Sequence, residues 1–116
     1  MKPVRTTRVA FGDERIRGAF LELKSGKFEE KDLAKHIQKA IDRLKEDPFI
    51  GIVEPRRLWP KEYIVKFSIN NLRKFNLPGG WRLMYTIRGD EVEIVSIILE
   101  WLSHHEYERR FKYRQS

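Results

Sequence analysis

The fold of this 116-residue chain is decided by one stretch, Asn71-Leu-Arg-Lys-Phe-Asn-Leu-Pro-Gly-Gly-Trp-Arg-Leu-Met-Tyr85. Residues 72–77 favour a strand, and the Pro-Gly-Gly that follows them is typical of a turn. Beyond the turn, alternate residues are apolar: Trp81, Leu83, Tyr85 and Ile87. Because a strand points successive side chains to opposite faces, this alternation predicts a half-buried strand with Arg82 and Arg88 on its open face.

The segments after this strand predict the rest of an antiparallel sheet and a final helix. Gly89-Asp90 fits a two-residue hairpin turn with glycine first, and residues 92–99 carry apolar side chains on both faces, which predicts an interior strand. Ser103-His104-His105-Glu106 has the capping-box pattern, in which the Ser and Glu side chains each bond the other residue's amide. We therefore expect a helix to begin at His104.

The N-terminal half predicts a strand and two helices. Residues 4–11 favour a short strand, and from Asp13, a plausible N-cap, apolar residues recur at helical spacing as far as Leu23. A second apolar stripe runs from Leu33 to Leu44 and ends before Pro48, and a short helix is expected over residues 61–66. The predicted fold class is α+β, with two N-terminal antiparallel helices packed on a small antiparallel sheet, a short C-terminal helix, and residues 1–116 in a single domain.

Composition and charge indicate a basic globular domain. The chain is 41% hydrophobic and lacks cysteine, which excludes a disulfide framework, a zinc ribbon and a thiol nucleophile. With no long apolar run, we expect a cytoplasmic protein with no membrane partner. The net charge is +7, and the segment from Lys61 to Arg88, with six basic residues and one acidic, contributes +5 of it. Such an excess favours an anionic partner, with nucleic acid as the leading candidate.

The order of elements and the quoted stretch together resemble the RelE/ParE superfamily of toxin–antitoxin toxins. The resemblance lies in a Leu-x-basic-apolar-x-apolar strand, a glycine-containing turn and an aromatic-Arg-Leu-apolar-Tyr strand, followed by an apolar strand and a terminal tyrosine. It extends from the first strand to Tyr107. Within the superfamily the chain looks more like the RelE-type messenger RNA interferases than the gyrase-poisoning ParE branch, because basic residues and an acid/base-capable side chain remain where the cleft is expected.

The RelE-type resemblance implies the toxin of a type II toxin–antitoxin system, acting as a ribosome-dependent endoribonuclease that needs no metal or other cofactor. In that reaction the 2′-hydroxyl of the RNA attacks its own phosphate in the ribosomal A site, and translation is inhibited. The reaction needs a base for the 2′-hydroxyl, an acid for the leaving 5′-oxygen and cations for the charge on phosphorus. The implied partners are messenger RNA, the ribosome and a cognate antitoxin protein.

Three residues are the catalytic candidates. Arg82 matches the family's strand arginine and offers a planar, bidentate donor to the phosphate. His104 lies in the first turn of the predicted helix, where the helix dipole favours a neutral imidazole that can act as general base, and His105 is the alternative. Tyr107 matches the family's terminal tyrosine, which can stack on a base or orient the 2′-hydroxyl, although it can equally pack on Phe111.

The candidates for binding nucleic acid are four further basic residues: Arg73, Lys74, Lys66 and Arg110. Lys74 matches a basic family position on the neighbouring strand, and Arg73 is less well aligned. Two positions depart from the interferase pattern: Asn76 stands where a second basic residue is common, and Trp101 stands where one choice of gap places a cleft arginine. These departures favour one alternative, a catalytically degenerate module that binds nucleic acid or protein. A third reading, a ParE-like inhibitor of DNA gyrase, rests on the shared fold alone.

Overall fold

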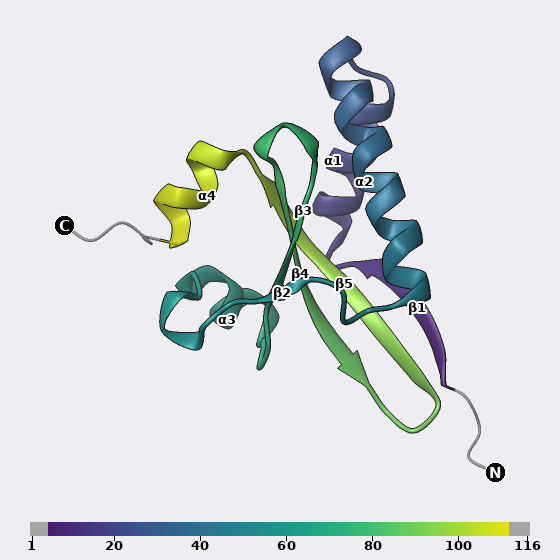
Figure 1. The fold of residues 1–116 in the computed structure, drawn as a ribbon, viewed down its shortest axis with the longest axis vertical. Helices are drawn as coiled ribbons and strands as arrows, with labels where there is room; N and C mark the ends of the chain where they lie inside the picture. The colour runs from purple at the N-terminus through teal and green to yellow at the C-terminus, as the bar shows by residue number, and fades with distance from the viewer. Residues whose placement is uncertain (1–4, 112–116) are drawn as a thin grey trace.

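The computed structural model describes residues 5–111, with four helices and five strands in this part of the chain (Figure 1). In chain order they are β1 (Thr6–Phe11), α1 (Glu14–Lys24), α2 (Phe28–Glu46), β2 (Ile52–Val53), α3 (Lys61–Phe67), β3 (Arg73–Asn76), β4 (Arg82–Gly89), β5 (Glu93–Leu102) and α4 (His104–Phe111). The predicted order of a strand, two helices, further strands and a final helix is confirmed. None of the described helices combines the length and apolarity that crossing a membrane requires.

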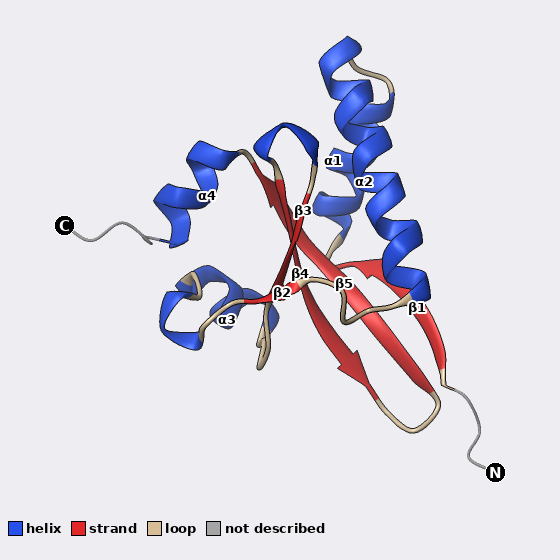
Figure 2. Cartoon of the chain, in the orientation of Figure 1, coloured by secondary structure: helices blue, strands red, loops and turns tan. Residues whose placement is uncertain are grey.

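The five strands form one mixed sheet in the order β1-β5-β4-β3-β2 (Figure 2). Strands β2 to β5 pair antiparallel with their neighbours, whereas β1 lies parallel to β5. The prediction of a purely antiparallel sheet is therefore wrong at this edge. Parallel neighbours need a long crossover connection, and here all the elements from α1 to β4 lie between the two strands in sequence.

Side-chain bonds and local backbone conformation fix the ends of the predicted elements. The Ile16 amide donates to Asp13 Oδ1 at 2.8 Å, which confirms the N-cap of α1. The capping box of α4 is also present, because the Ser103 amide donates to Glu106 Oε1 at 2.9 Å and the Glu106 amide donates to Ser103 Oγ at 3.2 Å. Helix α4 therefore begins at His104, as expected.

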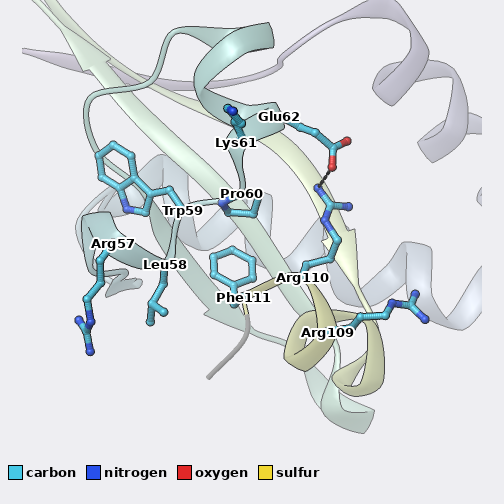
Figure 3. Close-up of a pocket in the computed structure, with 9 residues that line it drawn as sticks. All are labelled: Arg57, Leu58, Trp59, Pro60, Lys61, Glu62, Arg109, Arg110 and Phe111. Atoms are coloured by element: carbon cyan, nitrogen blue, oxygen red, sulfur yellow. Dashed lines mark ion pairs between the residues drawn. The ribbon is translucent and has the colours of Figure 1, made fainter. Parts of the chain in front are cut away.

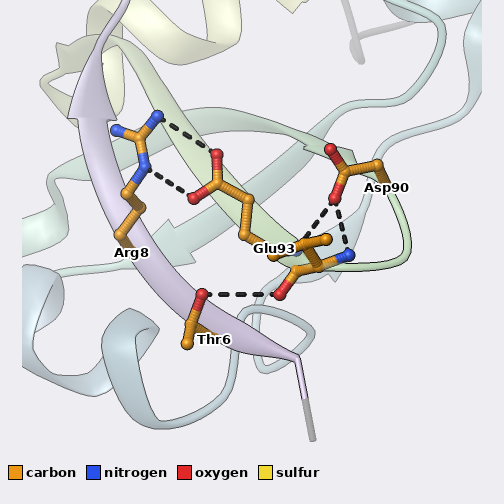
Figure 4. A network of polar contacts seen from close by, with 5 residues as sticks. Thr6, Arg8, Asp90 and Glu93 are labelled. Carbon is orange, nitrogen blue, oxygen red and sulfur yellow. Dashed lines mark hydrogen bonds and ion pairs between the residues drawn. The ribbon is translucent and has the colours of Figure 1, made fainter. Parts of the chain in front are cut away.

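The turn between β4 and β5 differs from the prediction of a glycine-first turn. Gly89 is still paired, opposite Ile94, and the chain reverses between Asp90 and Glu93. The Asp90 carboxylate accepts hydrogen bonds from the amides of Val92 at 2.7 Å and Glu93 at 2.9 Å (Figure 4). These bonds hold the pKa of Asp90 below its usual value. An aspartate side chain, rather than a glycine backbone, thus shapes this turn.

Helices cover both faces of the sheet (Figure 1). Helices α1 and α2 build one core with alternate residues of β4, Leu83 and Tyr85. Helices α3 and α4 build a second core on the other face, which includes Met84. The predicted open face of β4 is therefore wrong at its middle, where Met84 and Thr86 are buried. Strand periodicity marks which residues share a face, but it does not show that distant short helices cover it.

A β-bulge in β5 directs the chain toward α4. Met84 lies opposite Glu100 but Tyr85 lies opposite Ile98, so Leu99 is an extra residue in β5. The side chains of Leu99 and Glu100 consequently both lie on the face of the sheet that α3 and α4 cover. There Leu99 joins the second core, and Glu100 accepts a hydrogen bond from the Tyr63 hydroxyl. The bulge therefore fixes the end of β5 from which α4 begins.

Candidate active site

The structure brings four of the seven predicted site residues together at one end of the sheet: Lys74, Arg82, His104 and Tyr107. Lys74 pairs with Met84, and Asn76 pairs with Arg82. Because directly opposed residues of neighbouring strands point to the same side of a sheet, these two pairs share one face of β3 and β4. Arg82 also pairs with Leu102, the last residue of β5. Because α4 begins two residues after Leu102, its first turn lies beside Arg82.

The Arg82 guanidinium is held by three groups. Its Nη1 donates to the Gly80 carbonyl at 2.5 Å, and its Nη2 lies 3.3 Å from His104 Nδ1. Its Cζ atom lies 5.2 Å from the centroid of the Tyr107 ring. A cation over an aromatic face at this distance is attracted by the ring quadrupole. The Nε atom is buried and has no hydrogen-bond partner among residues 5–111. The guanidinium is thus oriented with its Nε donor unsatisfied by the described residues, and an unsatisfied buried donor in a folded protein needs a specific explanation, such as a role in the chemistry of a site.

His104 turns Nδ1 toward this arginine. A guanidinium can only donate, so Nδ1 accepts in this contact when the imidazole carries its hydrogen on Nε2. The Nε2 atom lies 3.5 Å from Glu108 Oε1. The side chain is 60% exposed, so a substrate can reach it. His105 is exposed as well, but within the described residues it forms no hydrogen bond or ion pair.

Tyr107 lies beneath the arginine and is only 4% exposed. Its ring stacks on Phe111 with centroids 4.7 Å apart, the packing alternative that the sequence left open. Its hydroxyl donates to Glu54 Oε2 at 2.7 Å and accepts from Lys74 Nζ at 2.9 Å. In this arrangement the ring supports Arg82 and is not exposed for stacking on a base.

Glu54 is a member of the site that the sequence did not indicate. It is 2% exposed, and a buried carboxylate is stable only when charges and hydrogen bonds compensate it. Its amide donates to the Leu72 carbonyl at 2.9 Å and its carbonyl accepts from Trp59 Nε1 at 2.9 Å. With its backbone held on both sides, Glu54 presents its carboxylate to Tyr107. The sequence around it, with Gly51 and Pro55, favours a loop, and nothing local distinguishes this glutamate from a solvated one.

The three other predicted basic residues lie apart from this cluster and have structural partners. Arg73 Nη1 donates to the carbonyls of Phe49 at 3.1 Å and Gly51 at 2.8 Å. Lys66 lies 3.3 Å from an Asp13 carboxylate oxygen. Arg110 Nη2 lies 3.1 Å from a carboxylate oxygen of both Glu62 and Glu100. Their proposed contacts with nucleic acid remain predictions.

Glu100 anchors a second polar network behind the site. The Tyr63 hydroxyl donates to it, and burial, reinforced by the nearby carboxylate, raises the pKa of Tyr63 strongly. Arg110 connects the same carboxylate to α4. The sequence does contain a signal that could have marked Glu100, since it is the only charged residue between Ile94 and Leu102. A lone charge in an apolar strand must be paired when it is buried.

Comparison with known protein families gives one finding. The model of the family described as ParE toxin of type II toxin-antitoxin system, parDE, matches residues 8–99. No curated protein and no solved structure matches the chain. The matched range contains Lys74 and Arg82 and ends before α4, so His104 and Tyr107 lie beyond it. The match agrees with the superfamily resemblance and does not distinguish its RelE-like from its ParE-like members.

Proposed function

We propose that this chain, which belongs to the ParE toxin family of type II toxin–antitoxin systems, inhibits translation by cutting messenger RNA on the ribosome, with Arg82 and His104 as the reacting pair. A cognate antitoxin is the partner that membership in the family implies. The observation that carries the proposal is the 3.3 Å approach of Arg82 Nη2 to His104 Nδ1. It sets a phosphate-binding cation beside a nitrogen that can accept a proton.

The reaction assigned to this pair is attack of a ribose 2′-hydroxyl on the adjacent phosphate. The hydroxyl transfers its proton to His104 Nδ1, the 2′-oxygen bonds to phosphorus, and the bond from phosphorus to the 5′-oxygen breaks. The 5′-oxygen leaves with a proton taken from water, and the product carries a 2′,3′-cyclic phosphate. Arg82 stabilises the charge that develops on the phosphate oxygens. When a phosphate oxygen binds Nη2, Nδ1 is released from its contact with the arginine and is free to act as base.

The groups below the pair position it. Tyr107 supports the guanidinium through its ring, and Lys74 adds a second positive charge 4.7 Å from the centroid of that ring. Glu54 holds the Tyr107 hydroxyl and offsets part of the local positive charge. This arrangement keeps Arg82 oriented before substrate arrives, so little reorganisation is needed during the reaction.

Primer extension on a messenger RNA translated in a purified system tests the proposal. The proteins compared are the wild type, Arg82→Ala and Arg88→Ala, the last removing the same charge from an exposed position of the same strand. We expect ribosome-dependent cuts with the wild type and with Arg88→Ala, and a rate at least about 100-fold lower with Arg82→Ala. Equal cutting by Arg82→Ala, shown to be folded by its thermal transition, would refute the role of this arginine.

Inhibition of DNA gyrase is the second candidate function. It is favoured by the description of the matching family, and by two features that reduce the groups available for RNA cleavage: Asn76 opposite Arg82 and the occupied hydroxyl of Tyr107. A gyrase inhibitor should produce DNA cleavage complexes with purified gyrase and leave messenger RNA intact in the translation assay. Salt-dependent RNA binding without cuts in either assay would instead indicate the catalytically degenerate binding module.

A further inference from the structure

A second cationic site lies at the far end of α4 from His104. A cavity of about 420 Å³ opens between the C-terminal turn of α4 and the segment from Arg57 to Glu62 that leads into α3 (Figure 3). Six residues separate His104 from Arg110, which corresponds to about 9 Å along a helix. The cavity is therefore separate from the Arg82 and His104 pair but close to it.

The cavity has an excess of positive charge. Four cationic side chains line it, Arg57, Lys61, Arg109 and Arg110, against one carboxylate, Glu62. That carboxylate is bound by Arg110, with 3.1 Å between their nearest atoms. No acidic side chain in the described part of the chain forms an ion pair with the other three cations. Like charges gathered around one concavity repel one another unless an anion binds between them.

The same cavity has a fixed aromatic side. The Trp59 indole is held by a hydrogen bond of 2.9 Å from Nε1 to the Glu54 carbonyl and packs partly on the second core. The Arg56 guanidinium lies over one face of the ring, 5.2 Å from its centroid, so the part of the ring that lines the cavity is what a ligand can contact. In Figure 3 the ring stands across the cavity from Arg110, with Pro60 and Phe111 between them. An immobilised aromatic ring loses little entropy when a flat ligand stacks on it. The cavity thus combines an apolar surface for a base with cations for a phosphate.

We propose that this cavity is a subsite for single-stranded RNA, which holds one nucleotide with its base against Trp59 and its phosphate near Arg57, Lys61 and Arg109. Aromatic platforms flanked by cations are the usual means by which proteins bind single strands without reading their sequence. The choice of RNA rests on the proposed function, whereas the test below measures binding alone.

The test is fluorescence anisotropy of a short fluorescein-labelled oligouridylate titrated with the full chain, without ribosomes, at several salt concentrations. The variant Arg57→Ala/Lys61→Ala is compared with Lys31→Ala/Lys35→Ala, which removes equal charge from the exposed groove between α1 and α2. We expect the plot of log affinity against log salt to become shallower in the cavity variant, with the magnitude of its negative slope reduced by about 1.4, at about 0.7 per phosphate contact. The control should leave that slope unchanged. Equal slopes for the two variants would overturn the proposal.

The aromatic contribution is tested separately. Trp59→Leu should weaken RNA binding about tenfold, and Trp59→Phe, which keeps a ring, should retain most of the affinity. Binding that is indifferent to both changes, combined with displacement of the RNA by polyglutamate, would assign the cavity to an acidic protein segment and overturn the proposal. The anisotropy titration measures binding and not cleavage. If the protein binds RNA in this cavity but makes no cuts in the translation assay, the proposed function is refuted and the subsite stands.

Discussion

The hydroxyl of Tyr107 is predicted to contribute more to stability than a tyrosine hydroxyl in the other core. It bonds two charged groups, the Glu54 carboxylate at 2.7 Å and the Lys74 ammonium at 2.9 Å. Tyr107→Phe removes both bonds and retains the ring that stacks on Phe111 and supports Arg82. The substitution therefore tests the polar network with little change in apolar packing.

The expected magnitude follows from the kind of hydrogen bond lost. A bond to a charged group contributes about 2 kcal/mol, so the two bonds correspond to a loss of about 4 kcal/mol. In a domain of this length that loss lowers the melting temperature by roughly 15 °C. Tyr85→Phe is the matched control, because the Tyr85 hydroxyl is also buried but bonds only neutral groups, the Pro48 carbonyl at 2.8 Å and the Gly51 amide at 2.9 Å. Those two bonds correspond to about 2 kcal/mol.

Urea denaturation of the wild type and both variants at neutral pH measures the two losses. The network described here requires Tyr107→Phe to lose about twice as much free energy of unfolding as Tyr85→Phe, with unchanged dependence on urea concentration. A loss for Tyr107→Phe equal to or smaller than that for Tyr85→Phe would show that Glu54 and Lys74 do not depend on this hydroxyl. It would also remove the argument that Glu54 positions the site.

Three further predictions concern local features. The bond from the Ile16 amide holds the pKa of Asp13 below its usual 3.8, so its contribution to stability is present above that value and lost as pH falls through the lower folded value. Asp13→Asn still caps α1 but carries no charge, so the free energy of unfolding, measured by urea titrations, should fall less as pH decreases than in the wild type. An equal fall in both proteins would contradict this. Gly18→Ala, where an added Cβ meets no atom within 4 Å, should raise the unfolding free energy by about 0.5–1 kcal/mol, and calorimetry showing no gain would count against it. Gly51→Ala places a Cβ 2.5 Å from the Tyr85 hydroxyl and should lower the melting temperature, contrary to what an exposed loop would show.

Local patterns predicted most of the elements correctly. The alternation after Trp81, the helical stripe from Leu33 to Leu44 and the capping box at Ser103 each depend on residues within a few positions, and each has the expected structure. The parallel pairing of β1 and the two-residue strand β2 were not predicted. Both depend on partners far along the chain, and β2 is too short to show a period.

The same division holds for the candidate site. Arg82 and Lys74 were expected on neighbouring strands, and their shared face follows from the register of β3 with β4. The proximity of His104 required the bulge in β5 and the packing of α4, neither of which has a local signal. Glu54 was missed for a similar reason, since its burial depends on α4 covering the loop in which it lies.

The pairing of Arg82 with His104 is the central claim, and one rate comparison tests it most directly. Single-turnover cleavage of messenger RNA on stalled ribosomes is measured for the wild type, His104→Ala and His105→Ala, both histidines being exposed neighbours in the first turn of α4. The account predicts a loss of about 100-fold or more for His104→Ala, the usual contribution of a general base, and a nearly unchanged rate for His105→Ala. Cleavage by His104→Ala at the wild-type rate, or an equal loss in both variants, would contradict it.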